Sequence, residues 1–190
     1  MRDSSGCPQG AACSPTLYNI LVSGISAKPF HQGTRLLHYA DDALLLRDIS
    51  DKDGEALFKE DAARYVEALK ELGLQVNAKK CKTMVFSVGP VASTLSSPLL
   101  LDGEEVEEVS CLRYLGIAVD RRLSFTQHWA DTAASAKAAV GRIGSLVGWD
   151  PMTFRFLLTQ RVIPLLLYSL SPCGPTNSSS WRKVEAVIRY

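Results

Sequence analysis

Two adjacent aspartates lie inside an apolar run, and this feature constrains the fold more than any other in the sequence. Residues 37–46 read LHYADDALLL, in which Asp41 and Asp42 interrupt a strand-like pattern. Successive side chains of a strand point to opposite faces, so the two carboxylates of a continuous strand could not face one ligand. A turn at the pair removes this constraint, and the sequence therefore predicts a hairpin with Asp41 and Asp42 at its turn.

Helical patterns lie on both sides of this hairpin. Ser14 and Pro15 are typical of a helix start, because the serine can cap the helix and proline fits its first turn. A second helical pattern covers residues 53–72 and ends before Gly73. The next residues, 74–87, have the β-branched and aromatic pattern of a strand. Hairpin, helix and strand make up most of a split β-α-β unit, in which a helix covers an antiparallel sheet.

The rest of the chain adds a second hairpin and a helical region. A Pro/Ser-rich connector leads to Asp102-Gly103, which lies between apolar arms and predicts a two-residue hairpin turn. The glutamates that follow predict a solvated strand face. From Ser124 onward the pattern is helical, most clearly over residues 128–148, where three glycines lower helix propensity by roughly 1 kcal/mol each. Together these elements predict an α+β fold.

Charge is divided unevenly along the chain. Residues 1–110 hold 11 basic and 16 acidic side chains, whereas residues 111–190 hold 10 basic and 4 acidic ones. A basic second half suits a phosphate backbone as partner, although an ordinary solvated surface could show the same excess.

Cysteine usage and the chain ends indicate the cellular compartment. The five cysteines are scattered without a C-x-x-C pair, so we expect small buried residues in a reducing compartment. The N-terminus lacks an apolar signal-peptide core, and the apolar stretch VIPLLLYSL is too short to span a bilayer. We expect an intracellular protein that is not secreted and has no membrane partner.

Five segments, in order, resemble a known family. Tyr39-Ala40-Asp41-Asp42 between apolar arms resembles the active-site hairpin of reverse transcriptases. The upstream GCPQGAACSPTLYNI and the downstream LGLQVNAKKCKTMVF resemble further segments of these enzymes. CLRYLGIAVDRRLSFTQHW and VIPLLLYSLSPCG are similar to the thumb entry and thumb of non-LTR retrotransposon enzymes of the LINE, Jockey and R1 type. The resemblance covers residues 6–174.

This resemblance implies an architecture and a set of partners. It implies a partial polymerase palm over residues 1–120 and a mostly helical, thumb-like segment over residues 121–190. The implied partners are an RNA template paired with a DNA primer, a dNTP, and the N-terminal palm and fingers segment of the same element. A two-ion Mg²⁺ site is implied, with Mn²⁺ as an alternative, and the nucleus is the implied location.

The resemblance assigns catalytic roles to three residues. Asp41 would be a metal ligand and Asp42 its supporting carboxylate, whereas in the alternative interpretation Asp-Asp is simply a favourable turn sequence. Lys80, which follows Asn77 at the family's Asn-x-x-Lys spacing, would stabilise or protonate the leaving pyrophosphate. Lys79 and Lys82 are its rivals, and each of these lysines could equally be a solvated strand-edge residue.

Two further groups of residues would contact nucleic acid. Those at the nucleotide and template are Gln9, Gly10, Tyr39 and Ala40, and those at the primer are Tyr114, Leu115 and Gly116. Without the family context, Gln9 and Gly10 would form a plain helix-entry turn, and the tyrosines and Leu115 would be packed residues. His128 and Trp129 are expected to pack within a helix.

One part of the family's catalytic site has no counterpart here. A further metal-binding aspartate is expected from a strand that precedes the GCPQG-like loop, and only five residues lie ahead of Gly6. We therefore expect the isolated chain to lack polymerase activity. Three interpretations remain open: the palm and thumb portion of an RNA-directed DNA polymerase, a non-catalytic nucleic-acid-binding remnant of a retroelement, and an inert remnant.

Overall fold

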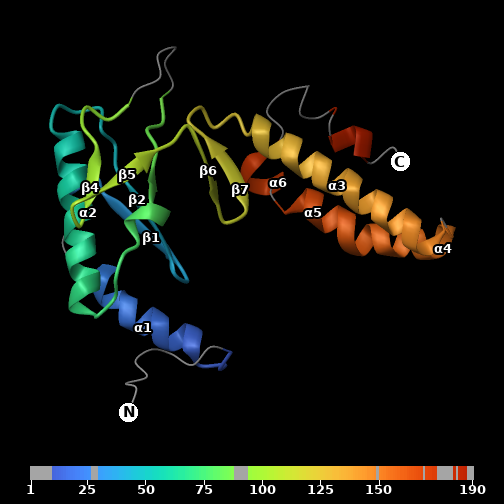
Figure 1. Cartoon of the computed structure of the whole chain (residues 1–190), viewed down its shortest axis with the longest axis horizontal. Helices are drawn as coiled ribbons and strands as arrows, with labels where there is room; N and C mark the ends of the chain where they lie inside the picture. The colour runs from blue at the N-terminus through green and yellow to red at the C-terminus, as the bar shows by residue number, and fades with distance from the viewer. Residues whose placement is uncertain are drawn as a thin grey trace. The chain divides into compact units, whose positions relative to one another are not determined.

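The chain forms two compact units in a computed structural model that describes residues 10–26, 30–87, 94–148, 150–168, 170–174, 182 and 184–187. Unit 1 comprises Met1–Thr83 with Thr94–Glu108, and unit 2 comprises Met84–Ser93 with Val109–Tyr190. Both contain helices and short strands (Figure 1), which confirms the predicted α+β class. None of the helices in the described ranges is long and apolar enough to cross a membrane.

The first hairpin of unit 1 forms as predicted, but its turn lies one residue earlier than predicted, with Asp42 as the first residue of β2. Strand β1 (Arg35–Tyr39) pairs in antiparallel fashion with β2 (Asp42–Leu46), and Tyr39 lies opposite Asp42. Ala40 and Asp41 therefore form the two-residue turn. Helix α1 (Ser14–Ser26) precedes the hairpin and begins at the predicted serine.

Helix α2 (Gly54–Glu71) follows the hairpin and has the predicted ends. It begins directly after Asp53, although the Asp53 side chain makes no capping hydrogen bond. At its C-terminal end Gly73 has a φ of 73°, and the N–H groups of Gly73 and Leu74 donate to the Lys70 and Leu69 carbonyls. This is a Schellman motif, which requires a left-handed residue and so favours glycine.

Both cores of unit 1 lie against α2. Near its C-terminal half, Ala68 and Leu69 pack with Val22 and Ile25 of α1. The other core joins Ala62 and Val66 to the strands that follow α2, and the partly buried Leu45 of β2 packs against it. One helix thus supports α1 and the acidic hairpin.

The segment after α2 is mostly not the strand that its sequence predicts. Residues 74–77 are irregular, Ala78–Lys80 form a single 3₁₀ turn (η1), and only Lys82–Thr83 form a strand, β3. This strand runs parallel to β5 and does not join the β1–β2 pair. The prediction of a strand over residues 74–87 was therefore wrong in extent. The apolar pattern indicates which side chains are buried, but it does not show whether a neighbouring strand is present to pair with.

The second hairpin of unit 1 turns at Asp102-Gly103, as predicted. Strands β4 (Leu99–Leu101) and β5 (Glu104–Glu108) are antiparallel, and the sheet order is β3-β5-β4. Val106 is buried while three of the four glutamates are exposed, which confirms the solvated face. The connector before β4 is held by Glu55 of α2, which accepts hydrogen bonds from the Ser96 and Ser97 N–H groups.

Unit 2 begins with a third hairpin and a long helix. Strand β6 (Cys111–Tyr114) pairs with β7 (Ile117–Asp120), and α3 (Thr126–Val147) follows. The sequence-based palm boundary at residue 120 includes this hairpin, whereas the compact units group it with the helices. Only Gly141 and Gly144 lie inside α3. Gly148, expected to weaken the helix, instead ends it with a φ of 60°.

The helices after α3 share one core with it that includes Trp129. They are α4 (Pro151–Leu157), the π-helical segment η2 (Leu158–Val162), α5 (Ile163–Leu167) and α6 (Leu170–Cys173). Trp129 is fully buried, and its Nε1 donates to the Cys173 carbonyl at 2.7 Å. His128 is also buried, so both residues pack as predicted.

The prediction that the cysteines are buried was wrong at two positions. Cys13 and Cys111 are exposed, Cys81 is half-buried and Cys173 is buried, while Cys7 lies outside the described residues. Cys13 lies in the turn before α1, and Cys111 is the exposed first residue of β6. Burial raises the pKa of the Cys81 and Cys173 thiols.

Candidate catalytic site

The β1–β2 hairpin presents its acidic pair away from the core. In the observed register, Leu36 and His38 are the half-buried residues of β1, while the alternating Leu37 and Tyr39 are exposed. Asp42 lies opposite Tyr39 and therefore shares the exposed face. Asp41 occupies the exposed turn itself. The hairpin therefore carries its half-buried leucines away from the tip and leaves Asp41 and Asp42 exposed at the tip.

The turn that carries Asp41 is strained. Ala40 has a φ of 51°, in the left-handed region that glycine usually occupies at such a position. An alanine there raises the energy of the folded state by roughly 1 kcal/mol. Such outliers persist where the surroundings hold them, and they concentrate at functional sites.

Helix α1 brings a tyrosine into the electrostatic neighbourhood of the turn. Burial raises the pKa of the Tyr18 phenol, and the nearby Asp41 charge raises it further. Tyr18 in turn lies near Tyr65 of α2, whose pKa is raised to about 12, mainly by burial. The structure thus places the upstream helix and the acidic turn, which are predicted parts of one site, in the same neighbourhood.

A buried carboxylate anchors the base of the hairpin. Asp61 of α2 is fully buried and accepts hydrogen bonds from the His31 N–H at 3.1 Å and the Thr34 hydroxyl at 2.6 Å. Arg47, which follows β2, donates to the same Thr34 hydroxyl at 2.7 Å and lies 3.7 Å from Asp61. The segments entering and leaving the hairpin are therefore tied to one residue of α2.

The donor set partly fits a divalent cation. Asp41 and Asp42 offer the carboxylate oxygens that Mg²⁺ and Mn²⁺ prefer. Within the described ranges, however, no group of three His, Cys, Asp or Glu side chains could hold a metal ion together. The pair can supply two ligands of a site, and the remaining ligands would have to come from elsewhere.

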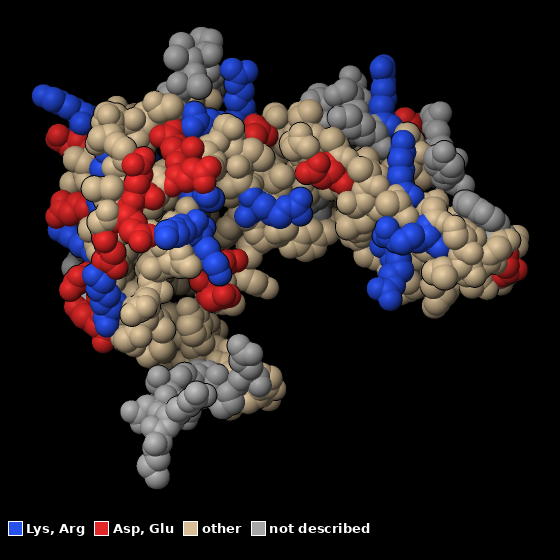
Figure 2. Space-filling model, viewed as in Figure 1, with Lys and Arg blue, Asp and Glu red and all other residues tan. Residues whose placement is uncertain are grey.

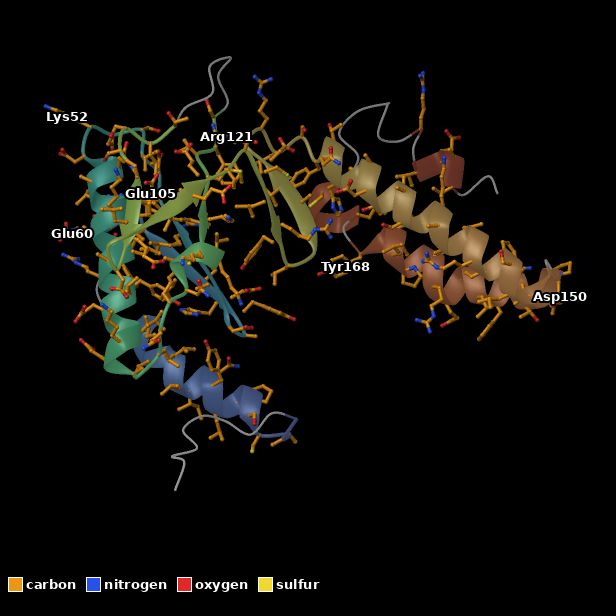
Figure 3. The ribbon with its side chains drawn as sticks, viewed as in Figure 1. Lys52, Glu60, Glu105, Arg121, Asp150 and Tyr168 are labelled. Atoms are coloured by element: carbon orange, nitrogen blue, oxygen red, sulfur yellow. The ribbon has the colours of Figure 1, made fainter. Side chains whose placement is uncertain are left out.

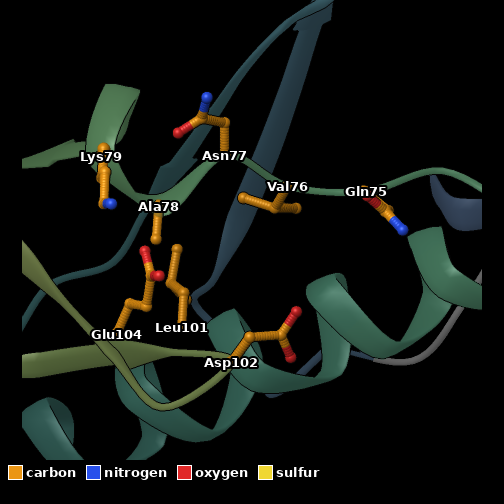
Figure 4. A pocket seen from close by; sticks show the side chains of 8 residues that line it. All are labelled: Gln75, Val76, Asn77, Ala78, Lys79, Leu101, Asp102 and Glu104. Atoms are coloured by element: carbon orange, nitrogen blue, oxygen red, sulfur yellow. The ribbon is translucent and has the colours of Figure 1, made fainter.

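The three candidate lysines differ in surroundings. Lys82 forms an ion pair with Glu107, so it is engaged within the sheet. Lys79 lines an open groove of about 550 Å³ with Asn77, Asp102 and others (Figure 4). Lys80 is exposed at the end of η1, and in the described part of the chain no hydrogen bond or ion pair links it to the acidic pair. Its assignment to the leaving group stays a prediction.

The predicted template and nucleotide residues are only partly described. Gly10 is exposed with a φ of 84°, a conformation suited to a turn into α1, and Gln9 lies outside the described residues. Tyr39, 64% exposed, and Ala40 lie at the hairpin tip. The structure therefore brings Tyr39 and Ala40 together with the acidic pair and leaves Gln9 untested.

The predicted primer residues form a turn of unit 2. Tyr114 and Ile117 are the last paired residues of β6 and β7, and Leu115 and Gly116 have φ values of 46° and 81°. Positive φ at both central positions matches a type I′ turn. The hairpin leans on α3, since the Ala118 N–H donates to Nδ1 of His128 at 3.3 Å.

Figure 2 shows that charge differs between the two units. Acidic side chains gather over α2 and the β4–β5 hairpin on the visible face of unit 1, whereas the helices of unit 2 carry mainly basic ones. The sequence beyond Ser110 has ten basic and four acidic residues. An exposed basic surface of this kind favours contact with phosphates.

The family model described as "Reverse transcriptase (RNA-dependent DNA polymerase)" matches residues 2–119. The chain belongs to the reverse transcriptase family. Members of this family generally use divalent metal ions and act on a template and primer with dNTPs. The expected resemblance is therefore confirmed.

Curated relatives place this reverse transcriptase chain among proteins of mobile elements. It is 27% identical over 200 residues to the RNA-directed DNA polymerase from mobile element jockey of Drosophila melanogaster, covering 96% of this chain and 21% of the relative. Identity to the probable RNA-directed DNA polymerase from transposon BS of the same species is 25%, with the same coverage. A Pol polyprotein from the R1 2 element of Nasonia vitripennis is 28% identical over 65% of this chain and 31% of its own length.

The reverse transcriptase chain thus spans about a fifth of the length of the first two relatives. No solved structure matches it significantly.

Sequence reasoning missed two residues that support the candidate turns, one in each unit of this reverse transcriptase chain. Asp61 is the one charged residue on the buried stripe of α2, four residues after Leu57 and four before Tyr65, and that break in the apolar pattern was a readable signal. Tyr168 contacts the Leu115-Gly116 turn from a helix 53 residues further along the chain, and no local pattern announces such a contact.

Proposed function

We propose that this chain is the palm and thumb portion of an RNA-directed DNA polymerase that extends a DNA primer on an RNA template. The single observation that carries the proposal is the exposed turn Tyr39-Ala40-Asp41-Asp42, supported on α2, in a chain of the reverse transcriptase family. Unit 2 would hold the template–primer duplex through its basic side chains, without sequence readout.

In this proposal each residue of the hairpin has a defined task. Asp41 and Asp42 hold the divalent ions, and bound ions would activate the primer 3′-hydroxyl and stabilise the leaving oxygen. Tyr39 and Ala40 position the primer end and the incoming nucleotide. Lys80 offsets the negative charge that develops on the pyrophosphate. The further carboxylate and the fingers come from the preceding segment of the element protein.

Primer extension tests the proposal directly. A longer element protein that contains this chain and the preceding palm segment is incubated with primed RNA, dNTPs and Mg²⁺ or Mn²⁺. We expect Asp41→Asn to lower the extension rate by more than about a thousandfold. When catalytic residues act as a unit, removal of one can cost nearly as much activity as removal of all of them. Asp48→Asn is the matched control, since Asp48 is an exposed carboxylate just beyond β2 that accepts hydrogen bonds from its neighbour Ser50.

The 190-residue chain alone should give no extension, because its described residues offer only two of the ligands. Equal rates for the Asp41→Asn and Asp48→Asn proteins would overturn the catalytic role of the pair. Salt-dependent duplex binding without extension, even with the preceding segment present, would instead support a non-catalytic binding remnant.

A further inference from the structure

Tyr168 connects the helices of unit 2 to the predicted primer turn. Its hydroxyl donates a hydrogen bond of 2.8 Å to the Leu115 carbonyl. Its ring lies against Gly116, where a Cβ atom would be 3.4 Å from the ring edge. In Figure 3 the labelled Tyr168 lies at the end of α5, beside the tip of the β6–β7 hairpin. The contact therefore involves both halves of the turn.

The turn needs support of this kind. Leu115 has a φ of 46°, and the left-handed region is unfavourable for a leucine because its Cβ comes too close to the following carbonyl oxygen. A strained residue keeps such a conformation only when surrounding contacts hold it. The hydroxyl of Tyr168 holds the carbonyl of this strained residue, and its ring lies against Gly116, whose φ of 81° favours glycine.

Burial does not explain the position of Tyr168. The side chain is 64% exposed, so its ring gains little from the core. Its backbone is nevertheless fixed, because its N–H donates to the carbonyl of Pro164 in the first turn of α5. Tyr168 is thus a helix-anchored phenol whose polar end reaches a distant backbone carbonyl.

The rest of the hairpin is fixed by a second contact. His128 of α3 accepts the Ala118 N–H of β7 at 3.3 Å. The strands are therefore held by α3, and the tip is held by the residue that follows α5. A hairpin held at two points cannot move its tip independently of these helices.

From this geometry we propose that Tyr168 is a positioning residue for the primer: its hydroxyl and ring fix the Leu115-Gly116 turn in the conformation that contacts the primer strand. The inference rests on the proposed function, since it takes the primer as the ligand of this turn. Tyr168 acts through the turn, and loss of its hydroxyl loosens the primer contact without unfolding unit 2.

Two measurements on the 190-residue chain test this proposal with Tyr168→Phe. Hydrogen exchange of the Leu115, Gly116 and Ile117 amides reports the turn, and we expect about two- to tenfold faster exchange, as for the loss of one net hydrogen bond. Fluorescence anisotropy at fixed salt reports affinity for an RNA–DNA hybrid with a recessed primer end. We expect about threefold or more weaker binding to this hybrid.

Thr159→Val is the matched control, because the Thr159 hydroxyl also donates to a backbone carbonyl, that of Arg155 in the same unit. It should leave both readouts unchanged. Tyr168→Ala removes the ring as well and should enlarge both effects.

Three outcomes would overturn the inference. The first is unchanged turn exchange in Tyr168→Phe, and the second is faster turn exchange with unchanged hybrid affinity. The third is equal effects from Tyr168→Phe and Thr159→Val. If the wild-type chain has no affinity for the hybrid, both the proposed function and the assignment of this turn to the primer fail. The exchange data would still show separately whether Tyr168 holds the turn.

Discussion

Asp61 is a charged residue whose position is explained by its partners. A buried carboxylate is unfavourable unless hydrogen bonds and opposite charges compensate its lost hydration. Burial alone would raise the pKa of Asp61, but the hydrogen bonds from Thr34 and His31 outweigh it and lower the pKa. The side chain is therefore ionised at neutral pH, accepts hydrogen bonds from the segment before the hairpin, and forms an ion pair with Arg47 after it.

Asp61→Asn should destabilise unit 1 by about 3 kcal/mol, because the amide cannot accept all these hydrogen bonds and its NH₂ group would face donors. Denaturant unfolding followed by circular dichroism measures the change. Glu60→Gln is the control, since the Glu60 carboxylate is about half exposed and its ion pairs are with Arg64 and, at 3.7 Å, with His31. A similar small effect of both substitutions would show that Asp61 does not anchor the hairpin.

His128 gives unit 2 a defined pH dependence. Burial lowers the pKa of its imidazole, and the nearby Arg113 charge lowers it further. Its Nδ1 accepts the Ala118 N–H, so it must be unprotonated in the folded state. The unfolded chain then binds more protons near the ordinary histidine pKa, and stability falls as the pH drops through that range.

We expect unit 2 to unfold at lower denaturant concentration at about pH 5.5 than at about pH 7.5, the range in which histidine titrates. His128→Asn keeps an acceptor near the Nδ1 position and does not titrate. The variant should therefore show a smaller pH dependence than the wild type, measured by tryptophan fluorescence. An identical pH dependence in the two proteins would rule out His128 as its source.

Single residues also show where sequence reasoning reached its limit. A hairpin at the acidic pair could be predicted because two charges in an apolar run leave few alternatives, but the turn takes in Asp41 and not Asp42. The Asn-x-x-Lys spacing favours Lys80 over its rivals, and the structure adds the contact with Glu107 that separates Lys82 from the other two. Tyr168 could not be found at all, because its role depends on a residue 53 positions away.

Among the elements, the β1–β2 hairpin combines a strained turn with a well-supported base. Ala40→Gly should stabilise unit 1 by about 0.5 kcal/mol, because relief of about 1 kcal/mol of left-handed strain exceeds the entropy that glycine adds to the unfolded chain. Ala43→Gly, in β2 and outside the left-handed region, should destabilise it by about 0.5–1 kcal/mol.

Denaturant unfolding followed by circular dichroism compares the two glycine variants. Destabilisation by both would mean that Ala40 is not strained. The left-handed φ of Ala40 would then not raise the free energy of the folded state.

The π-helical segment η2 has a cause in the apolar pattern. Five apolar residues of the helices after α3 pack in one core and recur at every fourth position: Phe154, Leu158, Val162, Leu166 and Leu170. In an α-helix of 3.6 residues per turn, such a repeat would drift by about 40° per step around the axis. A π-turn contains more residues per turn and so brings the stripe back onto α3. The four-residue repeat is visible in the sequence, but a sequence read with the α-helical period of 3.6 residues does not predict the π-helical segment.

Residues 74–87 illustrate the opposite case, in which a pattern suggests an element that the fold does not form. Val76 and Ala78 are packed against the α2 core, as a strand residue would be. A strand also requires a hydrogen-bonding neighbour along its length, and only Lys82–Thr83 find one, in β5. The local sequence pattern predicts which side chains are buried, whereas strand pairing depends on segments elsewhere in the chain.

Considered as a whole, the chain has separate cores in its two units. The cores around α2 draw only on unit 1, and the core around Trp129 draws only on residues of unit 2. All three tryptophans, at positions 129, 149 and 181, also belong to unit 2. Tryptophan fluorescence therefore reports unfolding of unit 2, whereas circular dichroism reports both units.

We expect the two probes to give different unfolding midpoints, because units with separate cores need not unfold together. Asp61→Asn should move the circular dichroism transition to lower denaturant and leave the fluorescence midpoint unchanged. Coincident transitions in both proteins would show instead that the units unfold as one cooperative body.

The exposed thiols have a practical consequence. Cys13 belongs to unit 1 and Cys111 to unit 2, whereas Cys81 and Cys173 are less accessible and have raised thiol pKa values. Thiol reactivity follows the thiolate and its exposure, so in a Cys7→Ser background a spin label would attach preferentially to these two sites. Pulsed electron paramagnetic resonance on the doubly labelled chain would then measure the distance between the units directly, before and after a template–primer duplex is added.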